Sequence, residues 1–210
     1  MGPARYILRG QMFQRAITIT FLLLVINSAA MGAARKARAG SSGEELKAAF
    51  THLKANPNDR AAQKRYLKAF PQDYRGFMAL FGSGGTLADG YQCDYIFALS
   101  ALQAHHAAQV GRLLVQLSKD AEYRADAPSC LQHVLANYGS RYTKSFAVFL
   151  HGLSPKERDQ LITFLADIDT KVTSNLDYRR IIRNLKQLNE PELVKKFQQA
   201  QTERSKQSRV

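Results

Sequence analysis

The chain has 210 residues, of which 45% are apolar and 22% charged, and its 30 basic and 17 acidic side chains give a net charge of +13. With 11 Phe and 9 Tyr it is too apolar and too aromatic for a disordered chain, and two cysteines are too few for a disulfide-rich scaffold. The length suits one globular domain of ordinary size.

The first segment has the pattern of an export signal. Residues 1–34 contain no acid, and an apolar run from Ala16 to Ile26 is followed by the small residues Ser28-Ala29-Ala30. A basic start, a short apolar stretch and a small-residue exit are typical of a secretory signal peptide. We therefore predict a signal peptide over residues 1–33, with Met12 as an alternative start, and a periplasmic or extracellular protein.

A membrane anchor is the alternative interpretation of the same segment. The apolar run is shorter than the roughly 20 residues that span a bilayer. The cations Arg35, Lys36 and Arg38, however, follow it and could stop transfer. Apart from an uncleaved anchor or a basic surface, nothing in the sequence predicts contact with a membrane.

The rest of the chain consists of short segments with helical periodicity. Leu46, Ala49, Phe50 and Leu53 repeat at the i, i+3, i+4, i+7 spacing of one helical face, and no stretch of period-2 β-branched residues follows residue 34. We predict an all-α fold of about eight to ten short antiparallel amphipathic helices, packed as a compact bundle or as an irregular α-solenoid-like stack. The single domain should span residues 43–201.

The predicted domain is flanked by a flexible basic linker over residues 34–42 and by a basic tail over 202–210 that should fray. Local signals divide the domain into helices. They are the break at Asn56-Pro57-Asn58-Asp59, Pro71 in a first turn, the loop Gly82-Ser83-Gly84-Gly85-Thr86, a division at His105-His106, the capping box Ser154-Pro155-Lys156-Glu157, and the break Asn189-Glu190-Pro191.

The positive charge is concentrated at the two ends of the mature chain. Residues 35–72 hold nine basic and three acidic side chains, and residues 172–210 hold nine and four, whereas the middle is nearly neutral. Arg179, Arg180 and Arg183 lie within two predicted turns and favour an acidic protein partner. A solvated face is the alternative. Nucleic acid is not expected, because an exported protein rarely meets it.

Aromatic residues gather between positions 66 and 97, beside the glycine loop. Tyr74, Phe77, Phe81 and Tyr91 belong to this group and are candidate partner-binding residues, since interfaces are enriched in aromatic side chains. Packing in the core is the alternative explanation for them.

The two cysteines, Cys93 and Cys130, are predicted to form a disulfide if the protein is exported, and otherwise to be buried apolar residues. Cys130 also belongs to a polar cluster with Asp126, Ser129 and His133, whose spacing places all four on one side of a helix. A nucleophile, a base and an acid are the parts of an acyl-transfer site. The geometry along one helix is poor, however, so Asp126, Ser129 and His133 are candidates only.

No cofactor or metal site is predicted. The adjacent residues His105 and His106 point about 100° apart on a helix. The glycine loop lacks the lysine of a phosphate-binding loop.

Together, these features favour an exported, non-catalytic helical protein that binds a protein partner, such as a periplasmic inhibitor or an immunity-type protein. The alternatives are an envelope-associated hydrolase with a site near Asp126 and His133, and a basic protein bound to the envelope surface. The oligomeric state does not follow from the sequence.

Overall fold

The computed structural model describes residues 43–88, 92–122, 126–167 and 174–207. The chain divides into two compact units, residues 1–40 and 41–210, and all the described residues belong to the second. The predicted signal peptide and the predicted linker over residues 34–42 therefore lie outside the described residues.

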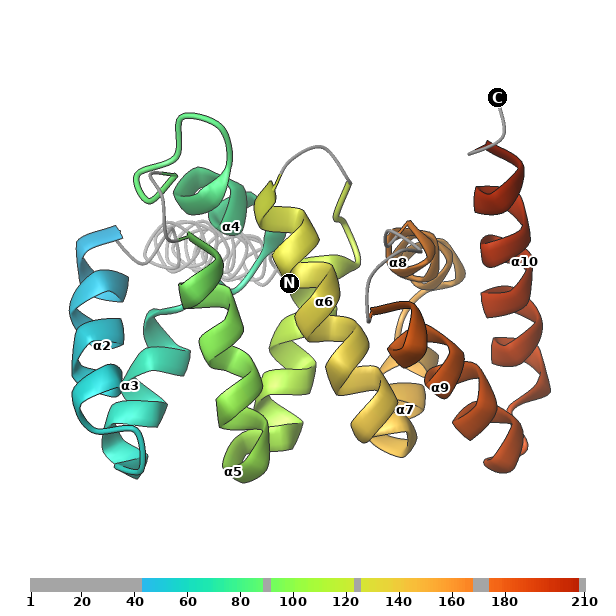
Figure 1. Cartoon of the computed structure of the whole chain (residues 1–210), viewed down its shortest axis with the longest axis horizontal. Helices are drawn as coiled ribbons and strands as arrows, with labels where there is room; N and C mark the ends of the chain where they lie inside the picture. The colour runs from blue at the N-terminus through green and yellow to red at the C-terminus, as the bar shows by residue number, and fades with distance from the viewer. Residues whose placement is uncertain (1–42, 89–91, 123–125, 168–173, 208–210) are drawn as a thin grey trace, which may run out of the picture. The chain divides into compact units, whose positions relative to one another are not determined.

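Helix is the only regular secondary structure in the described part of the chain, which confirms the predicted all-α fold class. Its helices pack closely, each antiparallel or inclined to its neighbours, and α2, α5, α6, α9 and α10 follow one another across Figure 1. The bounds are α2 Gly43–Ala55, α3 Arg60–Ala69, α4 Tyr74–Phe81, α5 Gln92–Ser118, α6 Asp126–Arg141, α7 Thr143–His151, α8 Pro155–Ala166, α9 Ser174–Gln187 and α10 Pro191–Gln207.

Local capping interactions determine where several helices begin and end. The Asp59 carboxylate accepts hydrogen bonds from the amides of Ala61 and Ala62 and so caps α3. Ser154 and Glu157 form the predicted capping box at the start of α8. Asn189, with φ of 57°, allows the reversal between α9 and α10.

The long helix α5 consists of two helices joined at a sharp turn. His106 has non-helical torsion angles (φ −132°, ψ 31°), and in Figure 1 the chain descends to this point and then returns upward. The predicted division at His105-His106 is thereby confirmed. Two apolar stripes, one before and one after the turn, face the core.

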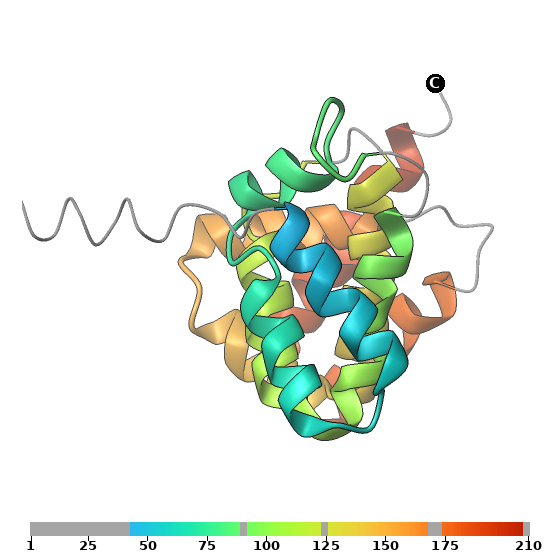
Figure 2. The ribbon, with the colours of Figure 1, turned by 90° about the vertical axis from the view of Figure 1, so that its left-hand side faces the viewer.

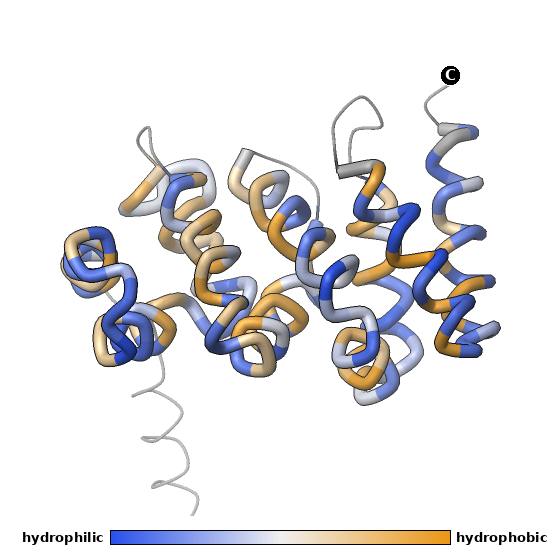
Figure 3. The backbone as a smooth tube through the Cα atoms, turned by 60° about the horizontal axis from the view of Figure 1, so that its bottom comes forward, coloured by the Kyte–Doolittle hydropathy of each residue, from blue (hydrophilic) through white to orange (hydrophobic). Residues whose placement is uncertain are grey.

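Helices α5 and α6 form the centre of the packing, and α9 lies against α6 on the side away from α5. Large buried side chains, including Tyr138, Phe146 and Ile181, fill the space between these helices. Figure 2 looks along the row of helices from the α2 end, with α2 and α3 in front. Figure 3 shows hydrophobic and hydrophilic residues alternating around the helices, the pattern expected of amphipathic segments.

The predicted disulfide between Cys93 and Cys130 is present. It joins the start of α5 to the first turn of α6, with 5.7 Å between the two Cα atoms. Cys130 is buried and Cys93 is partly buried against the core. The link therefore connects the two central helices at the end opposite to the His106 turn.

Two details differ from the sequence-based expectations. Pro71 precedes α4 instead of occupying its first turn, because Asp73 is the N-cap. The predicted frayed tail is helical up to Gln207, and the Arg204–Asp167 ion pair holds it against the end of α8. None of the described helices is both long and apolar enough to cross a bilayer.

Candidate functional site

The aromatic residues proposed for partner binding are mostly part of the core. Phe77 and Phe81 are 0% and 2% exposed, and their ring centroids are 5.1 Å apart, so the prediction that they contact a partner is corrected: they pack inside the domain. Tyr74 is half-buried, and its hydroxyl donates a hydrogen bond to the carbonyl oxygen of Glu122 at 2.9 Å. Tyr91 lies outside the described residues.

The glycine loop after α4 folds back onto that helix. The amide of Leu87 donates a hydrogen bond to the carbonyl oxygen of Leu80 at 2.8 Å, and the amide of Gly85 donates one to Gly82 at the same distance. Gly84 has φ of 75°, a left-handed conformation that favours glycine. The loop is thus a closed turn, and its backbone groups pair within the segment.

The polar cluster on α6 lacks the contacts of a catalytic site. Cys130 is in the disulfide, so its thiol is not available as a nucleophile. Ser129 and His133 are both partly buried, and neither side chain hydrogen-bonds to another described residue. The side chain of Asp126 is not among the described ones. A nucleophile must contact its base, and that contact is not made here.

The acid that acts on His133 comes from another helix. Burial lowers the pKa of His133, and the Asp177 carboxylate on α9 partly offsets this effect. Asp177 itself accepts a hydrogen bond from the Ser140 hydroxyl at 2.8 Å. The sequence pattern could not identify this neighbour, because it depends on how α9 packs against α6.

The described ranges contain no candidate metal centre. No group of three or more His, Cys, Asp or Glu side chains in them is placed to hold a metal ion. His106 makes a hydrogen bond to Gln63, and His151 pairs with Glu190 across 2.9 Å.

Polar contacts with the α6–α7 junction and with α10 fix the rotation of helix α9 about its own axis. Asn184 Nδ2 donates hydrogen bonds of 3.0 Å to the carbonyl oxygen of Ser140 and to Thr143 Oγ1, where α6 meets α7. The buried hydroxyl of Tyr178 donates one to the carbonyl oxygen of Phe197 on α10 at 2.7 Å. Because Ile181 and Leu185 are also fully buried, only one orientation of α9 satisfies its contacts.

This orientation exposes a basic surface, which we call the α9 face. Its exposed members are Leu176, Arg179, Arg180, Arg183 and Lys186. Leu176 is 57% exposed, unlike Ile181 and Leu185 on the same helix, which are fully buried. Arg180 makes an exposed ion pair with Asp177 at 3.4 Å, whereas Arg183 and Lys186 pair with no acid in the described part of the chain. The α9 face therefore combines an exposed apolar side chain with several cations.

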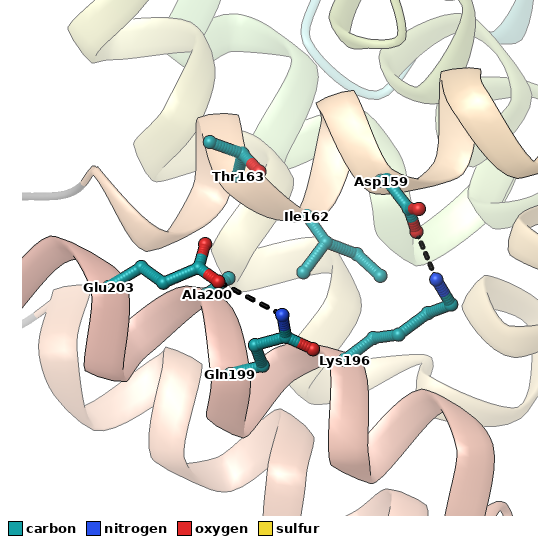
Figure 4. Close-up of a pocket in the computed structure, with 7 residues that line it drawn as sticks. All are labelled: Asp159, Ile162, Thr163, Lys196, Gln199, Ala200 and Glu203. Carbon is teal, nitrogen blue, oxygen red and sulfur yellow. Dashed lines mark hydrogen bonds and ion pairs between the residues drawn. The ribbon is translucent and has the colours of Figure 1, made fainter.

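A groove lies between α8 and α10 (Figure 4). The buried residues Ile162 and Ala200 line it, and an ion pair of 2.5 Å between Lys196 and Asp159 crosses from one helix to the other. Gln199 Nε2 donates a hydrogen bond to Glu203 Oε1 at 2.9 Å along α10. Four of the polar side chains in this view are thus joined in two pairs, Lys196 with Asp159 and Gln199 with Glu203.

The groove is small for a ligand site. Its volume is about 180 Å³, whereas pockets for drug-sized ligands measure roughly 300–1,000 Å³. A second hollow of about 130 Å³ continues it toward the Arg204–Asp167 ion pair. Two ion pairs that bridge α8 and α10 give the groove a structural role in holding the last helix.

The fold and its surfaces define an all-helical domain with a rigid basic helix face. The chain matches no protein-family model, no curated protein and no solved structure. Its function is therefore inferred from its sequence and from the described surfaces.

Proposed function

We propose that the protein is an exported, non-catalytic binding protein that uses the α9 face to hold an acidic surface of a protein partner, and thereby inhibits that partner. The observation that carries this proposal is the exposed Leu176 beside Arg180, Arg183 and Lys186 on a helix fixed by Asn184 and Tyr178. Interfaces are enriched in arginine, and a preformed surface loses little entropy on binding.

Charge alone does not distinguish a protein partner from other anions, but Leu176 does. A large apolar side chain that is 57% exposed gains free energy when a partner covers it, and this contribution is insensitive to salt. The cations would steer an acidic partner toward the surface and orient it. A mixed apolar and basic surface of this kind favours a protein over a purely ionic ligand.

Export rests on the sequence pattern of residues 1–33, which lie outside the described residues. The Cys93–Cys130 disulfide supports it, because disulfides persist in oxidising compartments. Fractionation of the source cells, with N-terminal sequencing of the protein recovered, tests both the compartment and the cleavage site. Recovery of the uncleaved chain from the cytoplasm would contradict export.

Binding is tested with the full chain, expressed in its source with a C-terminal tag and captured after crosslinking. Three charge reversals, Arg180→Glu, Arg183→Glu and Lys186→Glu, should remove a stoichiometric protein partner that the wild type captures. The matched control reverses three exposed cations on other helices, namely Lys47→Glu, Arg65→Glu and Lys68→Glu. It should retain the partner.

The apolar contribution is tested separately by Leu176→Ala. This variant should weaken capture by about fivefold to thirtyfold even at high salt, because loss of a buried leucine side chain is worth roughly 1–2 kcal/mol. If the triple charge-reversal variant of α9 and its triple control variant lose the partner equally, the binding is nonspecific and driven by charge. Retention of the partner in both would place the interface elsewhere.

A further inference from the structure

The contact between α3 and the turn of α5 fixes the ring of His106. His106 Nε2 and Gln63 Oε1 are 2.9 Å apart, and Gln63 Nε2 donates a hydrogen bond to the carbonyl oxygen of Pro57 at 2.7 Å. Since a carbonyl oxygen only accepts, the amide oxygen of Gln63 is left to accept from the imidazole. The neutral ring therefore carries its proton on Nε2, and Nδ1 has no hydrogen bond to a described residue.

Cationic side chains from two segments lie near enough to this contact to act electrostatically on His106. Arg60 and Lys64 are four residues apart on one side of α3, next to Gln63, and His105 precedes His106 in the α5 turn. Both Arg60 and Lys64 are exposed. Neither forms an ion pair with an acid within the described ranges. The α2–α3 turn and the α5 turn both lie at the lower side of Figure 1.

Three cations elsewhere in the domain have acidic partners. Lys119 pairs with Glu157 at 2.6 Å, Lys196 pairs with Asp159, and Arg204 pairs with Asp167. The acid nearest to Arg60 in sequence is Asp59, whose carboxylate accepts hydrogen bonds from the first amides of α3. At the junction where α3 meets the α5 turn, Arg60 and Lys64 therefore bring positive charge that no described carboxylate pairs with.

The electrostatics of His106 agree with this arrangement. Burial lowers the pKa of His106 first, and the positive charges of His105, Lys64 and Arg60 lower it further. No carboxylate acts in the opposite direction, whereas Asp177 does so at His133. The positive charges at the junction therefore disfavour protonation of the His106 imidazole.

We propose that Arg60, Lys64, His105 and His106 form a binding site for a phosphate-type oxyanion. The guanidinium of Arg60 and the ammonium of Lys64 would donate charge-assisted hydrogen bonds to its oxygens. The anion would supply the negative charge that this junction lacks. It would also favour protonation of His106, whose Nδ1 then becomes a further donor. This site is separate from the α9 face and does not depend on the function proposed for it.

The first test is a titration of the full chain with inorganic phosphate, followed by NMR of the His105 and His106 ring signals. We expect saturable shifts and a rise in the pKa of His106. In the double variant Arg60→Ala/Lys64→Ala, affinity for phosphate should fall about tenfold or more, because two charge-assisted hydrogen bonds are lost. The control Arg65→Ala/Lys68→Ala removes the same charge from exposed positions of the same helix and should bind as the wild type does.

A second arm identifies the source of the oxyanion. The full chain is sedimented with phosphatidylglycerol vesicles and with phosphatidylcholine vesicles, each with and without inorganic phosphate. Cosedimentation with phosphatidylglycerol that depends on Arg60 and Lys64, and that phosphate competes away, identifies a lipid headgroup. Phosphate binding without such cosedimentation identifies the free anion.

Three results would overturn the proposal. One is a set of shifts that never saturates, and another is equal loss of affinity in the two double variants. The third is the same response to chloride at equal ionic strength, which would indicate screening alone. Because all the substituted side chains are exposed, the variants should fold, and circular dichroism of each one checks this.

Discussion

The hydroxyl of Ser140 donates a hydrogen bond to Asp177 Oδ1 at 2.8 Å and so connects the end of α6 to the beginning of α9. This contact turns the acid of α9 inward, toward α6. The arginines of the same helix are left on the exposed side. One partly buried polar contact thereby sets the sign of the charge that the α9 face presents.

Asn184 fixes the other half of α9, and its loss should be measurable. We expect Asn184→Ala to lower the free energy of unfolding by about 1–3 kcal/mol, because the buried carbonyl oxygen of Ser140 loses a donor. Urea unfolding measures the effect. Gln187→Ala, at an exposed position of the same helix, should change stability little. A similar cost for both variants would mean that the hydrogen bonds of Asn184 are not responsible.

The disulfide should contribute strongly to stability. Cys93 and Cys130 are 37 residues apart in sequence, and closing a loop of that length in the unfolded chain is worth about 4 kcal/mol in the chain-entropy model. Cys93→Ser/Cys130→Ser should therefore unfold at a lower urea concentration. The wild type in reductant should approach the variant. An unchanged midpoint would show that the link does not constrain the unfolded chain.

Gly111 allows α5 and α6 to approach closely. A Cβ at this position would overlap the ring and hydroxyl of Tyr138, which is fully buried. We expect Gly111→Ala to destabilise the domain by about 1–3 kcal/mol through overpacking. Combining it with Tyr138→Leu should cost less than the sum of the two single changes, as measured in a double-mutant cycle. Simple additivity would contradict a direct clash.

Glu157 makes the domain sensitive to acid. The Lys119 ammonium and the Ser154 contacts lower the pKa of Glu157 to about 2. Since the folded-state pKa lies below that of the unfolded chain, the stabilisation is complete above the unfolded-state value, near pH 4.5, and is lost as the pH falls toward 2.

Thermal unfolding of Glu157→Gln and of the wild type tests this dependence. The difference in melting temperature between the two proteins should be largest near neutral pH and should shrink as the pH approaches 2. The exposed acid Asp94 offers a control, since Asp94→Asn removes the same charge at a position with no ion pair to a described residue. A pH-independent difference between Glu157→Gln and the wild type would show that packing, and not charge, is responsible.

The positions of the helices could be predicted because their signals are local. The break at Asp59, the capping box of Ser154 and Glu157, and the division at His106 depend on residues a few positions apart. The pairing of Cys93 with Cys130 could also be predicted, since the chain has only two cysteines. The cationic side chains of α9 were singled out by their spacing.

The burial of side chains and the contacts between helices depend on how the helices pack against one another. Whether Phe77 packs inside or contacts a partner depends on what covers α4, and the exposure of Leu176 depends on the rotation of α9. The hydrogen bond between Gln63 and His106 joins segments 43 residues apart, and that between Ser140 and Asp177 joins α6 to α9. Helical periodicity identifies an amphipathic face from neighbours along one helix, whereas burial and charge proximity arise between helices. The sequence by itself therefore determined the helices of this protein, and the tertiary structure alone decided which of their side chains face one another and which face solvent.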